Sequence, residues 1–272
     1  MKKLRILNLS LVAAVLCFGM SACRWVNGNG DNVNRGTGVV VEQTYEVKDF
    51  SELHLSSYMY VTLHHGDAPA LTIKADEAVL PLLGVSSRRG RLWIGVDDEE
   101  GYDQMLNRNM RIDVDVTYTD LKELMCTGAV MLTLTDTLRS PNLEIALYGA
   151  SVLSGAVAVE DHLNVTVVGA SSLQLSYLEA NRVESEVTGA SSVELTGQAR
   201  WAELAFVGSS MFKGEAWEVD SLTISVRGAS TATVNARHGL WAEARGASKI
   251  FYVGEPDTLE MTTTGASRIQ PR

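Results

Sequence analysis

A three-residue unit of small side chains recurs eight times from residue 128 onward, and this repeat restricts the fold more than any other feature. Each copy begins with glycine and usually reads Gly-Ala-Ser, with steps of 18 to 21 residues between successive glycines. So steady a period indicates a stack of equivalent structural units. The glycines are Gly128, Gly149, Gly169, Gly189, Gly208, Gly228, Gly246 and Gly265.

The residues on both sides of each glycine alternate between apolar and polar. Examples are Val165 and Val167 before Gly169, and Leu173 and Leu175 after it. A period of two is typical of strands with one buried face, and helical spacing is absent from this region. Since a propeller blade needs about 40 residues, the repeat predicts an all-β fold, a parallel β-solenoid with coils of about 20 residues. Each coil would comprise a strand, the triplet, a second strand and a connection of about seven residues.

This architecture gives the triplet a structural role. Equivalent residues of stacked coils form columns, and glycine at a corner permits positive φ without a Cβ to crowd the neighbouring coils. The alternation places glycine and serine on the inward side, where the serine hydroxyls can bond to one another or to the backbone. A catalytic nucleophile is disfavoured, because seven copies of one make no chemical sense and no triplet matches Gly-x-Ser-x-Gly. The expected inward serine ladder is Ser151, Ser171, Ser191, Ser210, Ser230, Ser248 and Ser267.

The amino terminus resembles a bacterial export signal. Basic residues precede an apolar run of about 15 residues, which is short for a membrane-spanning helix, and Met20–Cys23 reads MSAC, similar to a lipobox. We expect residues 1–22 to be a lipoprotein signal peptide and Cys23 to carry the lipid. The alternative is an ordinary signal peptide cut nearby. A flexible tether would span residues 23–37 and the β-solenoid 38–272, with irregular coils over 38–120 and regular repeats over 121–272.

Charge and cysteine content exclude several classes of protein. Removal of residues 1–22 takes away three cations and no acids, so the net charge changes from −10 to −13. Such a surface repels nucleic acid and anionic lipid, and the membrane should be contacted only through the lipid. With Cys17 removed and Cys23 acylated, Cys126 has no disulfide partner. Its place two residues before a triplet glycine predicts a buried, unreactive thiol.

The first coil can be located by internal alignment. Phe50–Ser57 (FSELHLSS) aligns without a gap on Leu121–Gly128 (LKELMCTG), which makes Ser57-Tyr58-Met59 a degenerate triplet. The excursion between the copies contains a predicted short helix at Asp76–Leu83 and an acidic loop at Asp97–Asn109. It also contains three strand-like runs, Ala70–Ala75, Arg91–Val96 and Arg111–Tyr118.

These segments together resemble the head GIN domain family. The resemblance rests on GNG at Gly28–Gly30, the run Val39–Val47, FSELHLSSYMYVTLHHGD, LTIKADEAVLPLL, RLWIGV and the triplets that follow, and covers nearly all of residues 28–272. Members are exported proteins and lipoproteins of unknown function described as auto-transporter adhesins. The resemblance implies a right-handed parallel β-helix. Ser57-Tyr58 departs from the small Gly-containing turn that the family commonly has there.

No residue cluster indicates catalysis, a cofactor or a metal. His64 and His65 point to opposite faces of a strand and cannot chelate one ion together, and His54, His162 and His238 are scattered. The loop acids lack a regular calcium-binding pattern, although a cation there is left open. Asp113 and Asp115 share a strand face with no evident partner. Arg227 and Arg245 stack on adjacent coils and offer at most a weak anion contact.

We therefore expect a non-enzymatic envelope lipoprotein whose solenoid surface binds glycans or proteins. A polysaccharide-active enzyme remains the alternative, favoured by a groove with two or more acids beside a cation, and a periplasmic structural or sensing component is a third reading. After Cys23 come Arg24-Trp25-Val26 and no acidic run, which slightly favours the periplasmic face of the outer membrane over the cell surface. Charge and proline at Arg268, Pro271 and Arg272 blunt the last edge, and a homo-oligomer that buries this edge remains open.

Overall fold

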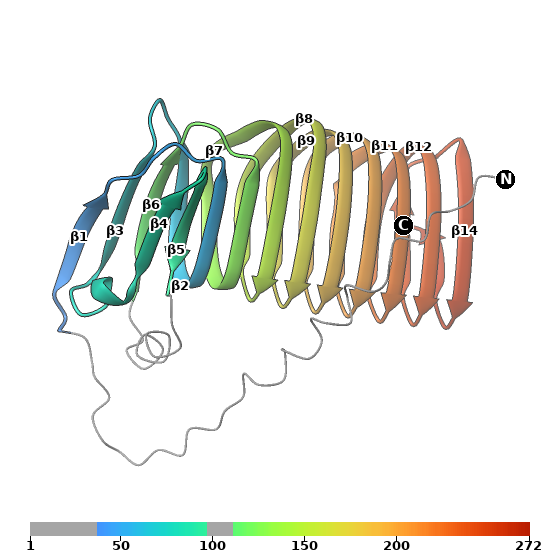
Figure 1. Ribbon diagram of the computed structural model, residues 1–272. Helices are drawn as coiled ribbons and strands as arrows, with labels where there is room; N and C mark the ends of the chain where they lie inside the picture. Colours follow the sequence, from blue (N-terminus) through green and yellow to red (C-terminus); the bar gives the residue numbers. More distant parts are fainter. Residues whose placement is uncertain (1–36, 97–110) are drawn as a thin grey trace, which may run out of the picture. The chain divides into compact units, whose positions relative to one another are not determined.

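The computed structural model describes residues 37–96 and 111–272, which form a β-solenoid of about seven coils of roughly 20 residues. Figure 1 shows the long strands lying side by side in sequence order. Within the described ranges, no helix is long and apolar enough to cross a membrane. The predicted signal peptide, Cys23 and nearly all of the tether lie outside the described residues. The regular part comprises β7 (Glu123–Gly149), β8 (Val152–Gly169), β9 (Ser172–Gly189), β10 (Ser192–Gly208), β11 (Met211–Gly228), β12 (Thr231–Gly246), β13 (Lys249–Val253), β14 (Thr258–Gly265) and β15 (Arg268–Pro271).

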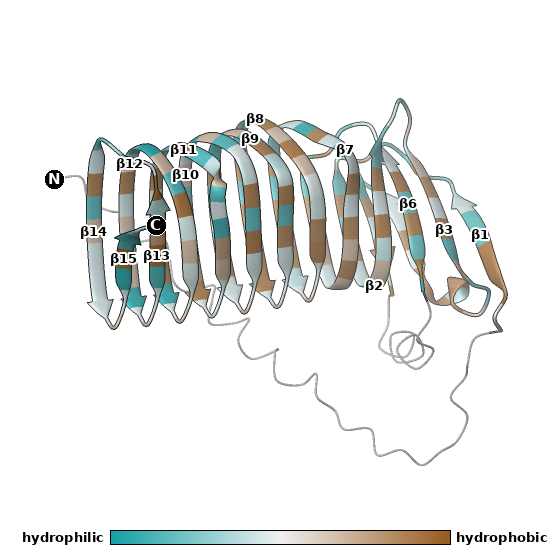
Figure 2. Ribbon diagram, turned by 180° about the vertical axis from the view of Figure 1, so that it is seen from behind, coloured by the Kyte–Doolittle hydropathy of each residue, from teal (hydrophilic) through white to brown (hydrophobic). Residues whose placement is uncertain are grey.

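Successive coils pair in parallel and in register, and the triplet glycines stack. Gly149 pairs with Gly169, and Gly169 pairs in turn with Gly189. The column of paired glycines continues in the same way to Gly265. Alternate side chains point inward and form one continuous apolar core, in which Cys126 is fully buried. Burial raises the pKa of the Cys126 thiol to about 12. Figure 2 shows the resulting alternation of apolar and polar segments along the strands.

The connection of about seven residues that we expected between strands is itself β-structure. In β8, Ala156–Val159 pair with Tyr177–Ala180 of the next coil, and only short register shifts mark the bends. The strand therefore continues around most of each coil. The reason is that a coil stacked between two others keeps its backbone groups paired through a bend, which leaves no need for a loop.

The corner residues are hydrogen-bonded between coils. Ala170 N–H donates to the Gly149 carbonyl oxygen at 2.7 Å, and the same bond recurs at each following corner. Six of the ladder serines are buried, whereas Ser267 in the last coil is half-buried. Their hydroxyls bond to backbone groups: Ser191 Oγ donates to the Gly169 carbonyl oxygen at 3.2 Å. The glycines, which we expected on the inward side, are half-exposed or exposed because the chain turns there.

The first coil starts where the internal alignment places it. Strand β2 (Glu52–His65) pairs with β7 in parallel, with Glu52 opposite Glu123 and Ser57 opposite Gly128. Ser57 has a φ of 91°, the left-handed conformation of the glycines above it. On the side of β2 away from β7, β5 (Arg91–Gly95) pairs with β2 only as far as Leu55 and Ile94. Among residues 37–96 and 111–272, no corner residue pairs with Ser57 on the side of β2 away from β7.

A mixed sheet covers the amino-terminal end of the stack. β6 (Asp113–Tyr118) continues the parallel pairing on β2, β3 (Ala70–Asp76) and β1 (Val40–Tyr45) add antiparallel strands, and β4 (Gly84–Arg88) forms a hairpin with β5. The predicted strands of this region are present. The predicted helix at 76–83 is wrong: a turn leads into a 3₁₀ segment, Leu80–Leu82, with Pro81 inside it. Asp76 still caps this turn, since its Oδ1 accepts from Ala78 N–H at 2.9 Å.

We predict that Gly189→Ala destabilises the protein far more than Gly90→Ala. Both glycines have positive φ, which costs an L-residue about 1–2 kcal/mol. A Cβ at Gly189 would lie 2.4 Å from the Gly169 carbonyl oxygen, whereas a Cβ at Gly90 would meet nothing within 4 Å. The close contact should add about 1–3 kcal/mol of strain. The free energies of unfolding in urea measure the difference, and equal losses in the two variants would contradict stacked corners.

Candidate functional site

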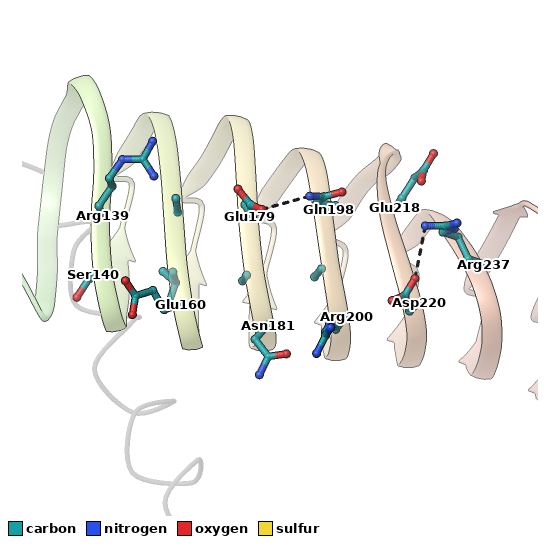
Figure 3. Close-up of a pocket in the computed structure, with 14 residues that line it drawn as sticks. Arg139, Ser140, Glu160, Glu179, Asn181, Gln198, Arg200, Glu218, Asp220 and Arg237 are labelled. Carbon is teal, nitrogen blue, oxygen red and sulfur yellow. Dashed lines mark hydrogen bonds and ion pairs between the residues drawn. The ribbon is translucent and has the colours of Figure 1, made fainter.

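An open groove of about 680 Å³ crosses the coils from β7 to β12 and is the candidate binding site. Two rows of polar side chains border it, and small buried residues form its floor (Figure 3). Residues on a row come from successive coils, one or two positions before or after the same bend. The first row contains Arg139, Glu179, Gln198 and Glu218, with Ala158 at the same position in β8; the second contains Glu160, Asn181, Arg200, Asp220 and Arg237; the floor contains Val159, Ala180 and Ala199.

The groove forms because the residues at one bend of consecutive coils are small. Val159, Ala180 and Ala199 form one in-register column, and the pairing of β8 with β9 shifts register directly after it. Three small side chains in consecutive coils leave the surface hollow where larger residues would fill the bend. The rows on either side are polar because their positions face solvent.

The rows present both charges and are partly cross-linked. Glu179 accepts a hydrogen bond from the Tyr177 hydroxyl at 2.7 Å and another from Gln198 Nε2 at 3.3 Å. The Tyr177 bond, followed by that of Gln198, lowers the pKa of Glu179 below its ordinary value. Asp220 Oδ1 lies 3.7 Å from Arg237 Nη1. Arg139, Glu160 and Arg200 add further charged groups to the lining of the groove.

Exposed aromatic side chains adjoin both rows. Tyr177 lies two residues before Glu179 and is 40% exposed, and Trp201 follows Arg200 and is 56% exposed. Among the described residues, these are the two aromatic members of the exposed large hydrophobic side chains. Exposed aromatic rings beside a polar groove are typical of ligand-binding surfaces, because they offer apolar area at low entropic cost.

The other residues considered from the sequence have local partners. His64 Nε2 contacts Asp115 Oδ2 at 2.9 Å, whereas His65 packs edge-on against Tyr118, so the two histidines do not act together. Our expectation that Asp113 and Asp115 have no partner is wrong: Arg111 Nε donates to Asp113 Oδ1 at 2.7 Å, and His64 pairs with Asp115.

Arg227 and Arg245 do stack on adjacent coils. Glu243 accepts from Arg245 Nε at 2.7 Å and lies 3.6 Å from Arg227 Nη2, and the two arginines help to lower the pKa of this carboxyl against its burial. Glu243 therefore balances one of the two positive charges of the arginine pair. The acidic loop 97–109 lies outside the described residues.

Sequence reasoning missed a cluster at the first coil. Carboxylate oxygens of Glu52 and Glu123 and a ring nitrogen of His54 lie within 4.8 Å of one another. The signal was present in the internal alignment, which already sets Glu52 beside Glu123 with His54 two residues further on the same face. The cluster becomes visible only when this register is applied to the outward positions of the strands.

Comparison with known proteins agrees with this architecture. A family described as "Putative auto-transporter adhesin, head GIN domain" matches residues 49–256, most of the chain. The chain belongs to this head GIN domain family. No curated protein matches it in sequence.

Solved structures share the head GIN domain fold at low sequence identity. A "putative lipid binding protein" from Parabacteroides distasonis and a "putative adhesin" from Parabacteroides merdae each align with a TM-score of 0.78 at 18% identity, over 88% of this chain and 98% of theirs. A "putative adhesin" from Bacteroides fragilis aligns with a TM-score of 0.63 at 18% identity, over 88% of this chain and 99% of its own. At this identity the likeness establishes the fold.

We predict that Tyr177→Phe raises the pKa of Glu179. The substitution removes the hydroxyl whose hydrogen bond contributes most to stabilising the charged carboxylate. Carboxyl titration by NMR measures the midpoint, and Glu243, which lies away from the groove, serves as the internal control. An unchanged Glu179 midpoint would show that the Tyr177 contact does not form in solution.

Proposed function

We propose that this head GIN domain protein is a non-enzymatic, adhesin-like protein of the cell envelope whose groove binds an extended polar ligand. The observation that carries the proposal is the groove across the coils of β7 to β12, with Tyr177 and Trp201 beside its two rows. The adhesin descriptions of the family and of a solved structure with the same fold support the same role.

The chemistry of the walls favours a glycan over an apolar molecule. Guanidinium, carboxylate and amide groups recur at the spacing of the coils, about 4.8 Å, and can form many hydrogen bonds with hydroxyl groups along a chain. The small floor residues allow close approach, and an exposed ring beside each row can cover the apolar face of a sugar ring. An extended segment of protein is the other ligand that fits a groove of this length.

The sequence supports export and lipid anchoring. We propose that Cys23 carries the lipid and holds the solenoid at the outer membrane, with the periplasmic side slightly favoured because no acidic run directly follows Cys23. Metabolic labelling with palmitate should mark the protein and should fail to mark Cys23→Ser. Labelling of both would place the lipid elsewhere.

We predict that substitutions in the groove abolish glycan binding without unfolding the protein. On a glycan array, Arg200→Ala and Trp201→Ala should each weaken binding by about tenfold or more, as expected for central arginine and tryptophan contacts. Lys213→Ala is the matched control, because Lys213 is an exposed cation paired with Glu194 on a different face of the coil. Equal binding by all three variants, or no binding to any glycan by the parent protein, would contradict a glycan-binding groove.

An enzyme acting on polysaccharide is the second candidate. The groove does combine several carboxylates with arginines, as such a site would require. The lowered pKa of Glu179 argues against its use as a general acid, since a glycosidase acid needs a raised pKa. Release of reducing ends from a bound glycan, lost in Glu160→Gln or Glu218→Gln, would favour the enzyme over the adhesin.

A further inference from the structure

We propose that Glu52, His54 and Glu123 form a binding site for a divalent transition-metal cation that links the first two coils of the solenoid. The site lies on the outer surface of β2 and β7, on a different part of the coil from the groove, and is independent of the proposed ligand. His54 Nε2 lies 2.5 Å from Glu123 Oε1, and candidate ligand atoms of all three residues lie within 4.8 Å of one another.

The ladder sets this geometry. Glu52 and Glu123 are in-register neighbours on adjacent parallel strands, and His54 follows Glu52 by two residues, so its ring projects from the same face. The three donors thus belong to two neighbouring columns on the same outer face: Glu52 and Glu123 share one column, and His54 lies in the other. One imidazole nitrogen and two carboxylates are a donor set suited to Zn²⁺, Mn²⁺ or Fe²⁺.

The surroundings limit solvent on one side. The side chain of His54 is 15% exposed and that of Glu123 is 25% exposed. His54 is flanked in register by Trp93 of β5 and Met125 of β7, both only partly exposed. Partial burial strengthens the attraction between carboxylates and a cation relative to a fully hydrated surface.

Charge at this position is incompletely compensated, which is a separate reason to expect a cation. Glu144 N–H donates to the Lys122 carbonyl oxygen at 2.8 Å, which makes Glu144 the next carboxylate of the column after Glu123. Glu144 and Glu123 both raise the pKa of the nearby Tyr148 hydroxyl, after its burial. In-register like charges repel one another.

Further along the same column, an arginine lies between two in-register carboxylates and offsets their repulsion. At Glu184 and Glu203, Arg182 Nη2 lies 2.7 Å from one carboxylate and 3.9 Å from the other, so one guanidinium bridges both. At the first coil, Arg91 contacts Glu52 with both of its bonds on Oε2, and Oε1 takes no part in them. A divalent ion between Glu52 and Glu123 would supply the missing bridge.

The test is calorimetric titration of the purified full chain with ZnCl₂, with Cys17→Ser and Cys23→Ser in every variant to remove thiol ligands. We expect one saturable site and a higher thermal unfolding midpoint with Zn²⁺. Glu123→Gln and His54→Gln should each weaken binding by about tenfold or more, since loss of even an outer-shell partner costs 10–100-fold. His238→Gln is the matched control, because His238 contacts a single carboxylate, Asp257, at 3.1 Å.

NMR of the histidine rings in the protein that keeps all its histidines makes the test independent of whether the variants fold. Addition of Zn²⁺ should shift the ring nitrogens of His54 and leave those of His238 unchanged. Absence of saturable binding, equal binding in His54→Gln, or an unperturbed His54 ring would each overturn the site and leave His54 as an ion-pair partner of Glu123.

Discussion

The continuous parallel backbone ladder through the corners is the interaction on which the rest of the structure depends. At each corner an N–H donates to the carbonyl oxygen of the glycine one coil earlier, for example Ala190 to Gly169 at 2.8 Å. A Cβ on the corner residue would strike that same oxygen. Glycine is therefore required by the close approach of two backbones as well as by its positive φ. Because the glycine corners of successive coils lie directly above one another, the residues on both sides of each corner are also held in register.

The ends of the stack show what the constraint demands, because it is relaxed there. Ser57 takes the corner position in the first coil, where no described residue pairs with it on the side away from β7. In the last coil, Ser267 still accepts a hydrogen bond from Ser248 N–H at 3.2 Å but is half-buried, since the described chain places no coil above it. The strand β14 is exposed along its whole length, including Leu259 and Met261. The first coil thus has serine in place of the corner glycine, and the ladder serine of the last coil is less buried than those of the coils before it.

Much of this fold could be predicted because the core-facing columns leave a pattern in the sequence. The alternation around the triplets predicted strands and the parallel stack, and the alignment of Phe50–Ser57 on Leu121–Gly128 predicted the register between β2 and β7. The short helix at 76–83 was wrong because helical spacing over one turn cannot be told from a capped 3₁₀ segment that contains Pro81. The prediction of a connection of about seven residues between strands was wrong, because polar residues at these positions give no sign that their backbone groups are paired with the next coil.

The outward surface was harder to predict, for a physical reason. Burial does not select residues there, so neither the rows of the groove nor the cluster at Glu52 shows a periodic signal. The partner of Asp115, His64, comes from a neighbouring strand that only the register brings close, whereas the partner of Asp113, Arg111, lies two residues earlier in the chain. Once the register is known, such contacts follow directly. Sequence reasoning therefore reaches the surface in a solenoid only by applying the column assignment to polar residues.

Distances between spin labels test the in-register stack most directly. Glu144, Thr223 and Glu260 occupy one column, with Thr223 four coils and Glu260 six coils after Glu144. At about 4.8 Å per coil, double electron–electron resonance should place labels at 144 and 223 about 19 Å apart, and labels at 144 and 260 about 29 Å apart. A separation that grows with coil number in this way supports the stack. Distances that fail to increase from the first pair to the second would contradict it.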